Sequence, residues 1–452
     1  MKWAMRMIGL ITGFSIFAAT IYVLNYMYMA CDDEWERILW HSFYEDKGKI
    51  DNIYLGSSHV FCDLDPYKLD QLNGQYNFNL ASSGQLMNGT YYLLKEADQW
   101  NDLSHVYVEL FYIYNIYDNF NADEDMMDTH TSHNWKNTDN MRLSLNKLQY
   151  MITMADPEKY PNIFWGFSRY RSHLDDWSYV ETTIAKKKSK EYIDYQYHND
   201  WDDGIGYDEY RKKGRFFSTR EYPSKERMYY QDRILVENPI AETSEAYLRK
   251  VISYCQTRGI TITLFISPIY ELQLISTEQY DNYLNQVKEI AAEYEIEIYD
   301  FNLTKEVYLP IQEPRYFRDV GHLNSAGADL YTDFFHKIMS CNATENQKYF
   351  YDTYAQKLAQ TEPEVYGIYY QYEPPVDDGT VPYRNMFIAS NRNNGMEYKI
   401  VMTPEENKDQ YLIQDFNENK TFKVTLEEHG MCTIAYRMND APDAVKSIEI
   451  AY

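Results

Sequence analysis

The sequence predicts an α/β fold built on a parallel sheet, with one membrane-spanning helix before it and a small all-β sandwich after it. Three observations support this architecture. Strand-like and helix-like segments alternate in two blocks, an uncharged run opens the chain, and short strand-like runs separated by turn-forming residues close it. Such alternation is typical of βαβ units, whose strands are parallel. With 452 residues, the chain is long enough for two or three domains.

Residues 1–30 form the predicted anchor. Lys2 and Arg6 precede an uncharged run over residues 7–30, which exceeds the roughly 20 residues that cross a bilayer core as a helix. The basic flank predicts a cytoplasmic N-terminus, so the rest of this single-pass cell-membrane protein is expected on the extracytoplasmic side. A cleaved signal peptide and a lipoprotein attachment at Cys31 are the alternatives, and neither has a well-formed cleavage site. Residues 31–50 are expected as a linker.

The α/β domain is predicted over residues 51–345. Five short apolar segments favour strands, and three longer segments with helical spacing favour helices. The strands are 53–55, 76–80, 106–110, 260–266 and 296–301, and the helices are 86–97, 246–255 and 280–294. Residues from about 116 to 240, here called the insert, interrupt this rhythm and are interpreted as a partly helical cap over the sheet. Chemistry is expected at the carboxyl ends of the strands.

Residues 346–452 are predicted to form a β-sandwich. Six short strand-like runs are separated by turn-forming residues, a spacing typical of small all-β domains. The runs are 365–372, 398–403, 411–416, 422–426, 432–437 and 446–452.

Composition excludes several classes of function. Lys and Arg number 43 against 69 Asp and Glu, a net charge of −26, which argues against nucleic-acid binding because that affinity depends on cationic side chains. Five cysteines without a Cys-x-x-Cys pair exclude a zinc ribbon or a thioredoxin-type site. His130 and His133 lack a third ligand at metal-site spacing, so neither a metal nor a cofactor is predicted. The basic run 186–190 is expected as a solvated face, with an anionic polymer or lipid headgroups as the alternative.

Two short segments contain residues suited to nucleophilic catalysis. Ser58 lies in a Gly-Ser-Ser turn directly after the first predicted strand, and a serine needs a base to become a nucleophile. Asp319 and His322 are three positions apart, so one loop or turn can direct the carboxylate to Nδ1 and leave Nε2 for a serine. Gly84, after the second strand, has no Cβ and can bring its backbone N–H close to an oxyanion.

Gly56-Ser57-Ser58, the Asn79…Gly84 turn and Asp319-x-x-His322 resemble the first, second and last blocks of the SGNH (GDSL-like) hydrolase superfamily. The resemblance covers roughly residues 50–340 and implies an SGNH-like (flavodoxin-like) sheet with Ser58 as nucleophile. The Gly-Ser-Ser variant resembles membrane-anchored extracytoplasmic members, namely the protein of lipoteichoic-acid D-alanylation (DltD) and the acetyltransferases of alginate export.

The sequence departs from that family after the third strand. The family's third block, Gly-x-Asn-Asp, supplies an asparagine to the oxyanion hole, and 109–115 has no such sequence. Asn115 or Tyr112 is a substitute, and Glu109 is a candidate for positioning an acceptor. The expected oxyanion hole therefore comprises Ser58, Gly84 and Asn115.

The leading hypothesis is an anchored serine O-acyltransferase that modifies a cell-envelope polysaccharide or a teichoic-acid-like polyol-phosphate polymer. The resemblance implies a membrane-bound partner that channels the acyl group. A carbohydrate esterase uses the same triad, and a non-catalytic glycan-binding protein is a third possibility. Tyrosines favour glycan contact in two clusters, because a flat amphipathic ring suits a sugar. The clusters are Tyr192, Tyr195, Tyr197, Tyr207 and Tyr210, and Tyr366, Tyr369, Tyr370 and Tyr372.

Overall fold

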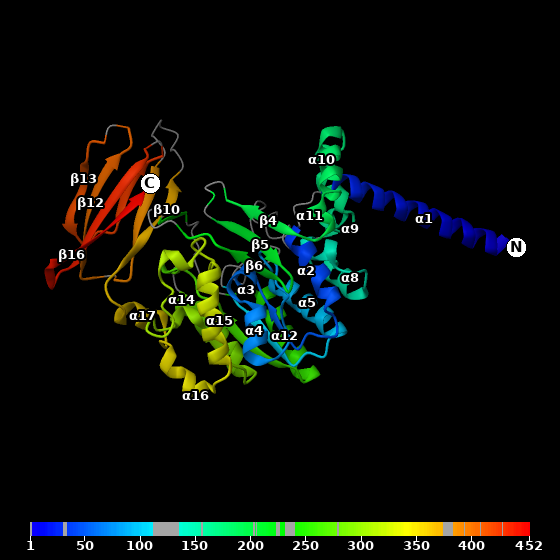
Figure 1. Ribbon diagram of the computed structural model, residues 1–452, viewed down its shortest axis with the longest axis horizontal. Helices are drawn as coiled ribbons and strands as arrows, with labels where there is room; N and C mark the ends of the chain where they lie inside the picture. The colour runs from blue at the N-terminus through cyan, green and yellow to red at the C-terminus, as the bar shows by residue number, and fades with distance from the viewer. Residues whose placement is uncertain are drawn as a thin grey trace.

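The fold is known from a computed structural model of the chain (Figure 1). The structure describes residues 2–29, 34–111, 135–154, 157–201, 204, 206–222, 227–230, 240–277, 280–373, 383–392, 394–406, 408–426 and 428–452.

Helix α1 (Lys2–Tyr28) projects from the body of the molecule (Figure 1). Its segment Met5–Tyr28 is 24 residues long and contains an 18-residue stretch with a mean hydropathy of 2.0, none of which is buried against the protein. The predicted helix is therefore present, and it is long and apolar enough to cross a membrane.

A five-stranded parallel sheet forms the centre of the α/β domain, in the order β2-β1-β3-β8-β9. The strands are β1 (Asn52–Leu55), β2 (Asn77–Asn79), β3 (His105–Glu109), β8 (Thr261–Ile266) and β9 (Ile298–Asp300). The predicted parallel sheet is confirmed. The chain leaves β1 in one direction to form β2 and then crosses back to form β3, so the strand order reverses between β1 and β3. Sites in such sheets lie beyond the carboxyl ends of the strands at this reversal.

Helices cover both faces of the sheet. On one face α5 (Met87–Trp100) packs against α12 (Glu242–Arg258), and on the other α15 (Ser325–Met339) packs against α3 (Ser58–Asp63) and α4 (Pro66–Asn73). Helix α14 (Tyr280–Glu293) connects β8 to β9. One apolar core unites these layers, with side chains such as Ile53, Val106 and Leu264 fully buried.

The segment expected as a linker contains a packed helix, α2 (Glu34–Glu45). Leu39, Trp40 and Phe43 are almost completely buried in the main core. Apolar residues three and four positions apart give α2 one apolar face, and the domain buries that face. The expectation of a linker over 31–50 is therefore wrong for the part that α2 occupies.

The insert divides into a helical half and a β half. The helical half consists of α8 (Leu145–Ile152), η1 (Pro157–Lys159), α9 (Tyr160–Phe164), η2 (Gly166–His173), α10 (Trp177–Lys187) and α11 (Lys190–Ile193). The β half is a three-stranded antiparallel sheet of β4 (Tyr197–Asp200), β5 (Tyr207–Arg211) and β6 (Arg215–Ser218). Helices α9 and α10 and η2 lie beside the end of α1 (Figure 1).

The C-terminal strands form two four-stranded sheets around a separate apolar core. One sheet has the order β14-β11-β10-β7 and the other β13-β12-β15-β16. The strands are β7 (Met228–Tyr230), β10 (Val365–Glu373), β11 (Tyr383–Ser390), β12 (Met396–Pro404), β13 (Tyr411–Asn417), β14 (Thr421–Thr425), β15 (Gly430–Met438) and β16 (Ala441–Ala451). This arrangement is sandwich-like. Strands β7 and β11 were not predicted, and β7 comes from the insert and pairs in parallel with β10.

The α/β domain continues past the expected boundary at residue 345. Helix α17 (Tyr354–Gln360) follows α16 (Ala343–Asn346) and η5 (Gln347–Tyr349). Tyr354 Oη donates a hydrogen bond of 2.6 Å to Glu271, and the Lys357 ammonium pairs with the other oxygen of the same carboxylate. Glu271 begins α13 (Glu271–Ile275), just after β8, so these contacts tie α17 to the α/β domain.

Candidate active site

The first site segment is the tight turn between β1 and α3. Gly56 has a φ of +150°, and a Cβ at this position would lie 2.6 Å from Glu109 Cβ and 2.9 Å from Val60 Cγ2. Only glycine fits, because the chain passes directly against the end of β3. Ser57 is the N-cap of α3 and its Oγ accepts from His59 N–H. Ser58 is therefore the first residue of the helix and is partly exposed.

The second segment is the loop that connects η4 (Pro314–Tyr316) to α15. An antiparallel bridge pairs Phe317 with Leu323, and Arg318 N–H donates to His322 C=O at 3.0 Å, so the loop is closed at its base. Asn324 then caps α15 by accepting from two backbone N–H groups. This closed loop holds Asp319 and His322 side by side.

The structure brings Ser58, His322 and Asp319 together in one line. Ser58 Oγ lies 2.7 Å from His322 Nε2, and His322 Nδ1 lies 2.8 Å from Asp319 Oδ1. Ser58 and His322 are 264 positions apart in the chain. With Nδ1 donating to the carboxylate, Nε2 is the acceptor for the serine proton, which is the arrangement of a general base.

Asp319 is fixed by its own loop. Oδ1 accepts from the backbone N–H groups of Gly321 and His322, each at 2.9 Å, in addition to the imidazole. Burial alone would raise the pKa of Asp319. The charge and hydrogen bond of His322, helped by Arg318, outweigh burial and hold this pKa below its usual range. The carboxylate therefore stays ionised and favours the imidazolium that forms when His322 takes a proton.

A buried carboxylate connects the two segments. Asp63, the last residue of α3, accepts from Leu323 N–H at 3.0 Å and is completely buried. Burial raises the pKa of Asp63 well above its usual range. This contact ties the end of the serine helix to the histidine loop, so the Ser58–His322 distance depends on it.

The β half of the insert packs behind the serine helix. Arg215 on β6 is only 1% exposed and donates to the C=O groups of Phe61 and Cys62, near the end of α3. On β5, Asp208 lies 3.6 Å from Arg318, whose guanidinium is also 3.6 Å from Asp319 Oδ2. The insert was expected as a cap over the sheet, and its β half packs against α3 and the loop that holds Asp319.

Glu109, the candidate for positioning an acceptor, is buried against the serine turn. Its side chain is 3% exposed, and Oε2 accepts from Ser57 Oγ at 3.1 Å and Ser57 N–H at 3.4 Å. Burial, opposed by these hydrogen bonds, raises the pKa of Glu109 to about 8. Glu109 thus holds the serine turn against β3.

His59 forms a wall of the site. Its ring stacks on Phe111 at 3.9 Å and lies 4.8 Å from the His322 ring, centroid to centroid. Burial, followed by the nearby His322, lowers the pKa of His59 well below its usual value. His59 therefore adds an uncharged aromatic surface beside the base.

The structure describes only some of the residues expected to form the oxyanion hole. Gly84 has a φ of +58°, in a turn whose Ser82 N–H donates to Gly56 C=O at 3.4 Å, so the two turns are adjacent. Asn115 and Tyr112 lie outside the described residues, as do His130 and His133. In the described part of the chain, no group of three or more His, Cys, Asp or Glu residues is arranged to hold a metal ion.

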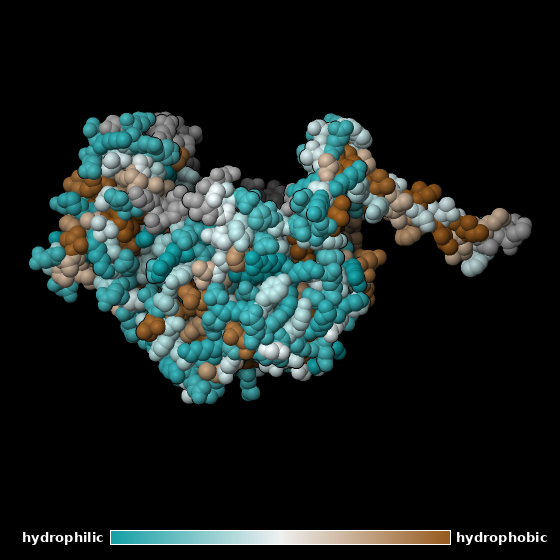
Figure 2. Space-filling model, viewed as in Figure 1, coloured by the Kyte–Doolittle hydropathy of each residue, from teal (hydrophilic) through white to brown (hydrophobic). Residues whose placement is uncertain are grey.

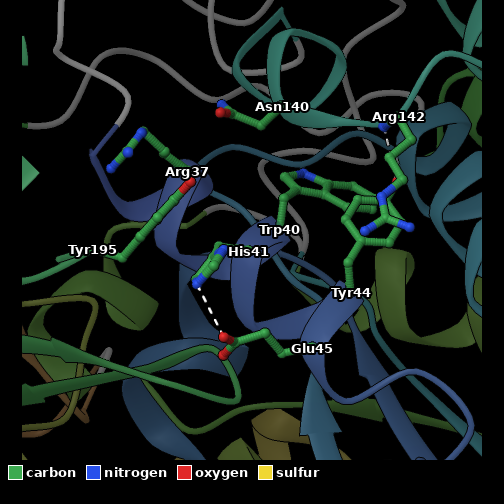
Figure 3. Close-up of a pocket in the computed structure, with 8 residues that line it drawn as sticks. All are labelled: Arg37, Trp40, His41, Tyr44, Glu45, Asn140, Arg142 and Tyr195. Atoms are coloured by element: carbon green, nitrogen blue, oxygen red, sulfur yellow. Dashed lines mark hydrogen bonds and ion pairs between the residues drawn. The ribbon is translucent and has the colours of Figure 1, made fainter. Parts of the chain in front are cut away.

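A separate pocket of about 340 Å³ lies between α2 and the parts of the insert that precede α8 and follow α11 (Figure 3). Its lining combines rings with two guanidinium groups and comprises Arg37, Trp40, His41, Tyr44, Glu45, Asn140, Arg142 and Tyr195. The Arg37 guanidinium carbon lies 3.8 Å from the centroid of the Tyr195 ring. The His41 ring stacks on the same tyrosine, with 3.5 Å between the ring centroids. Aromatic and cationic groups together suit a sugar or an anionic ligand.

Sequence reasoning missed Arg215, Arg318 and Asp63. Arg215 and Asp63 act through partners on distant segments, and Arg318 joins its neighbour Asp319 to the distant Asp208, so no local spacing in the sequence identifies these roles. The chain matches no model of a known protein family and no curated protein.

Proposed function

We propose that this protein is a membrane-anchored, extracytoplasmic serine O-acyltransferase of the SGNH type, acting on a cell-envelope polysaccharide or a polyol-phosphate polymer. The hydrogen-bonded line from Ser58 through His322 to Asp319 carries the proposal. The strand order and the position of Ser58 directly after β1 support the SGNH assignment. The basic residues before α1 and the acidic residues after it support an extracytoplasmic catalytic domain.

The reaction follows from the roles of the three side chains. His322 Nε2 takes the Ser58 proton while Oγ attacks the carbonyl of an activated acyl donor, and the leaving group departs with that proton. An acceptor hydroxyl then gives its proton to His322 and attacks the acyl-serine, and the proton returns to Ser58 Oγ. Asp319 stabilises the imidazolium in both steps.

The oxyanion would be stabilised by the backbone N–H groups of Ser58 and Gly84, with Asn115 as the third candidate donor. Each such donor contributes about 3–4 kcal/mol to transition-state stabilisation in serine hydrolases. An activated donor outside the cytoplasm has to be delivered, so the proposal includes a membrane-bound acyl-channelling partner.

The first test is covalent labelling of the full-length chain in detergent micelles. A fluorophosphonate probe is expected to label the wild type at Ser58 and to leave Ser58→Ala unlabelled. Ser340→Ala is the matched control, because Ser340 Oγ also lies near a histidine, 3.4 Å from His336 Nε2, and is exposed. Labelling that persists in Ser58→Ala would exclude the proposed nucleophile.

Transfer is separated from hydrolysis by the product. An aryl acetate donor is supplied with and without an oligosaccharide or a polyol-phosphate acceptor, and acylated acceptor is expected only with wild-type enzyme. Release of free acid alone, at a rate that acceptor does not change, would replace transferase by esterase.

The pocket in Figure 3 favours a second candidate, a non-catalytic glycan-binding protein. Its aromatic side chains offer stacking surface and its two arginines offer contacts for anionic sugars. The two functions separate when Ser58→Ala and Arg142→Ala are compared. Glycan binding that survives the first change and is lost in the second, without any probe labelling of the wild type, would establish the binding function instead.

A further inference from the structure

The helical half of the insert exposes large apolar side chains on the side of the molecule from which α1 leaves. Leu143, Leu145, Ile152, Trp165, Leu174 and Trp177 are each 42–82% exposed. We call this surface the α8–α10 face. Figure 1 places α8, α9 and α10 around the root of α1, and Figure 2 shows hydrophobic residues gathered there. Exposed apolar patches of this kind mark contacts with proteins or membranes.

The last turn of α1 is bound firmly to this face. Asn25 Oδ1 accepts from Phe167 N–H at 2.9 Å, and Tyr28 C=O accepts from Tyr179 Oη at 3.0 Å. The Lys187 ammonium donates to the C=O groups of Tyr26 and Met29, at 2.8 and 2.7 Å. The α8–α10 face therefore has a fixed position relative to the end of α1.

The length of α1 places that end in the lipid headgroup region. The apolar part of α1 starts at Met7, directly after Arg6, and about 20 residues at 1.5 Å each span the roughly 30 Å hydrocarbon core of a bilayer. Counted from Met7, the core ends near residue 26, so residues 27–29 extend beyond it, and the insert binds Tyr28 and Met29 there. The parts of the insert that touch them lie at the same depth.

The chemistry of the face fits this depth. Tryptophan is enriched where the hydrocarbon meets the headgroups, and Trp165 and Trp177 are 42% and 63% exposed. Leu145 at the start of α8 and Leu143 just before it, 72% and 82% exposed, extend the apolar surface. Amphipathic surface helices bury such side chains about 5–10 Å into the headgroup and acyl boundary.

We propose that the α8–α10 face lies in the bilayer interface, so that the extracytoplasmic part of the chain contacts lipid directly. The lipid bilayer is the occupant of this surface, because the face is continuous with the helix that enters the membrane. This inference rests on the anchoring of α1 in the proposed function. Its consequence is that the orientation of the Ser58 site relative to the membrane is fixed.

Spin labels on the full-length chain in phosphatidylcholine vesicles test the proposal. Leu145→Cys and Trp177→Cys carry the labels in a background with Cys31→Ser and Cys341→Ser, since Cys62, Cys255 and Cys432 are buried. Both labels are expected to collide several-fold more often with oxygen, which dissolves in lipid, than with a water-soluble nickel complex. Val307→Cys, at a residue 81% exposed on the α/β domain, is the matched control and is expected to show the reverse.

A label at Phe14, in the middle of α1, distinguishes failure of the interfacial-face proposal from failure of the membrane anchoring on which it rests. If Phe14→Cys reports lipid while labels at 145 and 177 behave like the label at 307, the interfacial face is excluded and the anchor stands. If Phe14→Cys also reports water, the anchoring itself fails and the inference fails with it.

The fluorescence of the native tryptophans gives a second test, in which Trp→Phe replacements leave the α8–α10 face apolar. In a Trp3→Phe background, brominated phosphatidylcholine is expected to quench part of the fluorescence, and this part is lost when Trp165 and Trp177 are both replaced by Phe. Equal quenching with and without the two tryptophans would contradict the proposal.

Discussion

The two halves of the insert each place a cation at the end of a helix, yet the two contacts differ in burial. In the β half, Arg215 is 1% exposed and donates to carbonyls of α3, directly behind the candidate nucleophile. In the helical half, the partly exposed Lys187 donates to the last carbonyls of α1. A hydrogen bond lost in a dry core leaves its partner unsatisfied, whereas water replaces one lost near the surface. The β half is therefore expected to affect the candidate site, and the helical half only the end of α1.

The largest effect is expected from Asp319→Asn, which acts on the site itself. An amide cannot hold the imidazole in the required tautomer, so the rate of fluorophosphonate labelling should fall roughly 10³–10⁴-fold. Labelling kinetics of the full chain in micelles measure this. Asp333→Asn, at an exposed carboxylate on α15 that pairs with Lys68, is the control. A loss of less than tenfold in Asp319→Asn would remove Asp319 from the triad.

Arg215→Ala tests the buried contact. It leaves two buried carbonyls without their donor and opens a cavity, so we expect a loss of about 3–5 kcal/mol in the free energy of unfolding. Hydrogen exchange should rise in residues 58–63 and stay unchanged at the end of α1. Arg211→Ala, which removes a half-exposed surface pair with Glu209, should cost less than about 1 kcal/mol. Equal losses of unfolding free energy in Arg215→Ala and Arg211→Ala would show that burial does not determine how much each arginine contributes to stability.

Glu109→Gln tests the contact between the end of β3 and the turn that carries Ser57 and Ser58. The folded-state pKa of Glu109 is about 8, above the unfolded value near 4.5, so the folded state binds more protons between these limits. Stability should therefore fall by about 3 kcal/mol as the pH rises from 5 to 8. The Gln variant still accepts from Ser57 and should lose this dependence.

Thermal unfolding of wild type and Glu109→Gln across that pH range measures the effect. Glu313→Gln, at an exposed carboxylate, is the control and should follow the wild type. Parallel pH profiles for wild type and Glu109→Gln would contradict the raised pKa.

The smallest effect is expected from Lys187→Met, which keeps the apolar stem and removes the ammonium. Loss of hydrogen bonds in a partly hydrated position should cost about 1 kcal/mol. Hydrogen exchange should rise in residues 24–29 and not in α3, the reverse of Arg215→Ala, and probe labelling should be unchanged. Lys188→Met is the neighbouring control. Faster exchange in α3 would mean that the two halves of the insert are coupled.

The sequence alone determined the features whose signal is local. Periodic apolar residues determined the five sheet strands and the helices α5, α12 and α14, and an uncharged run determined α1, whereas α15 was not predicted. Asp319 and His322 are three positions apart, so one loop was enough to pair them. Strand β11 was not predicted, because Arg384 occupies an inward-facing position and breaks the alternation of apolar and polar residues. In the fold, the Arg384 guanidinium donates a hydrogen bond to Glu428 C=O.

Only the tertiary structure decided the contacts between distant segments. The Ser58–His322 hydrogen bond spans 264 positions, and Arg215 meets α3 across more than 150. Helix α2 was mistaken for a linker because its apolar face has meaning only once a core exists to bury it. Side chains such as Arg215 and Lys187 look like ordinary surface cations in the sequence. The fold gives them their roles, because the unsatisfied carbonyls that they meet become neighbours only when the chain is folded.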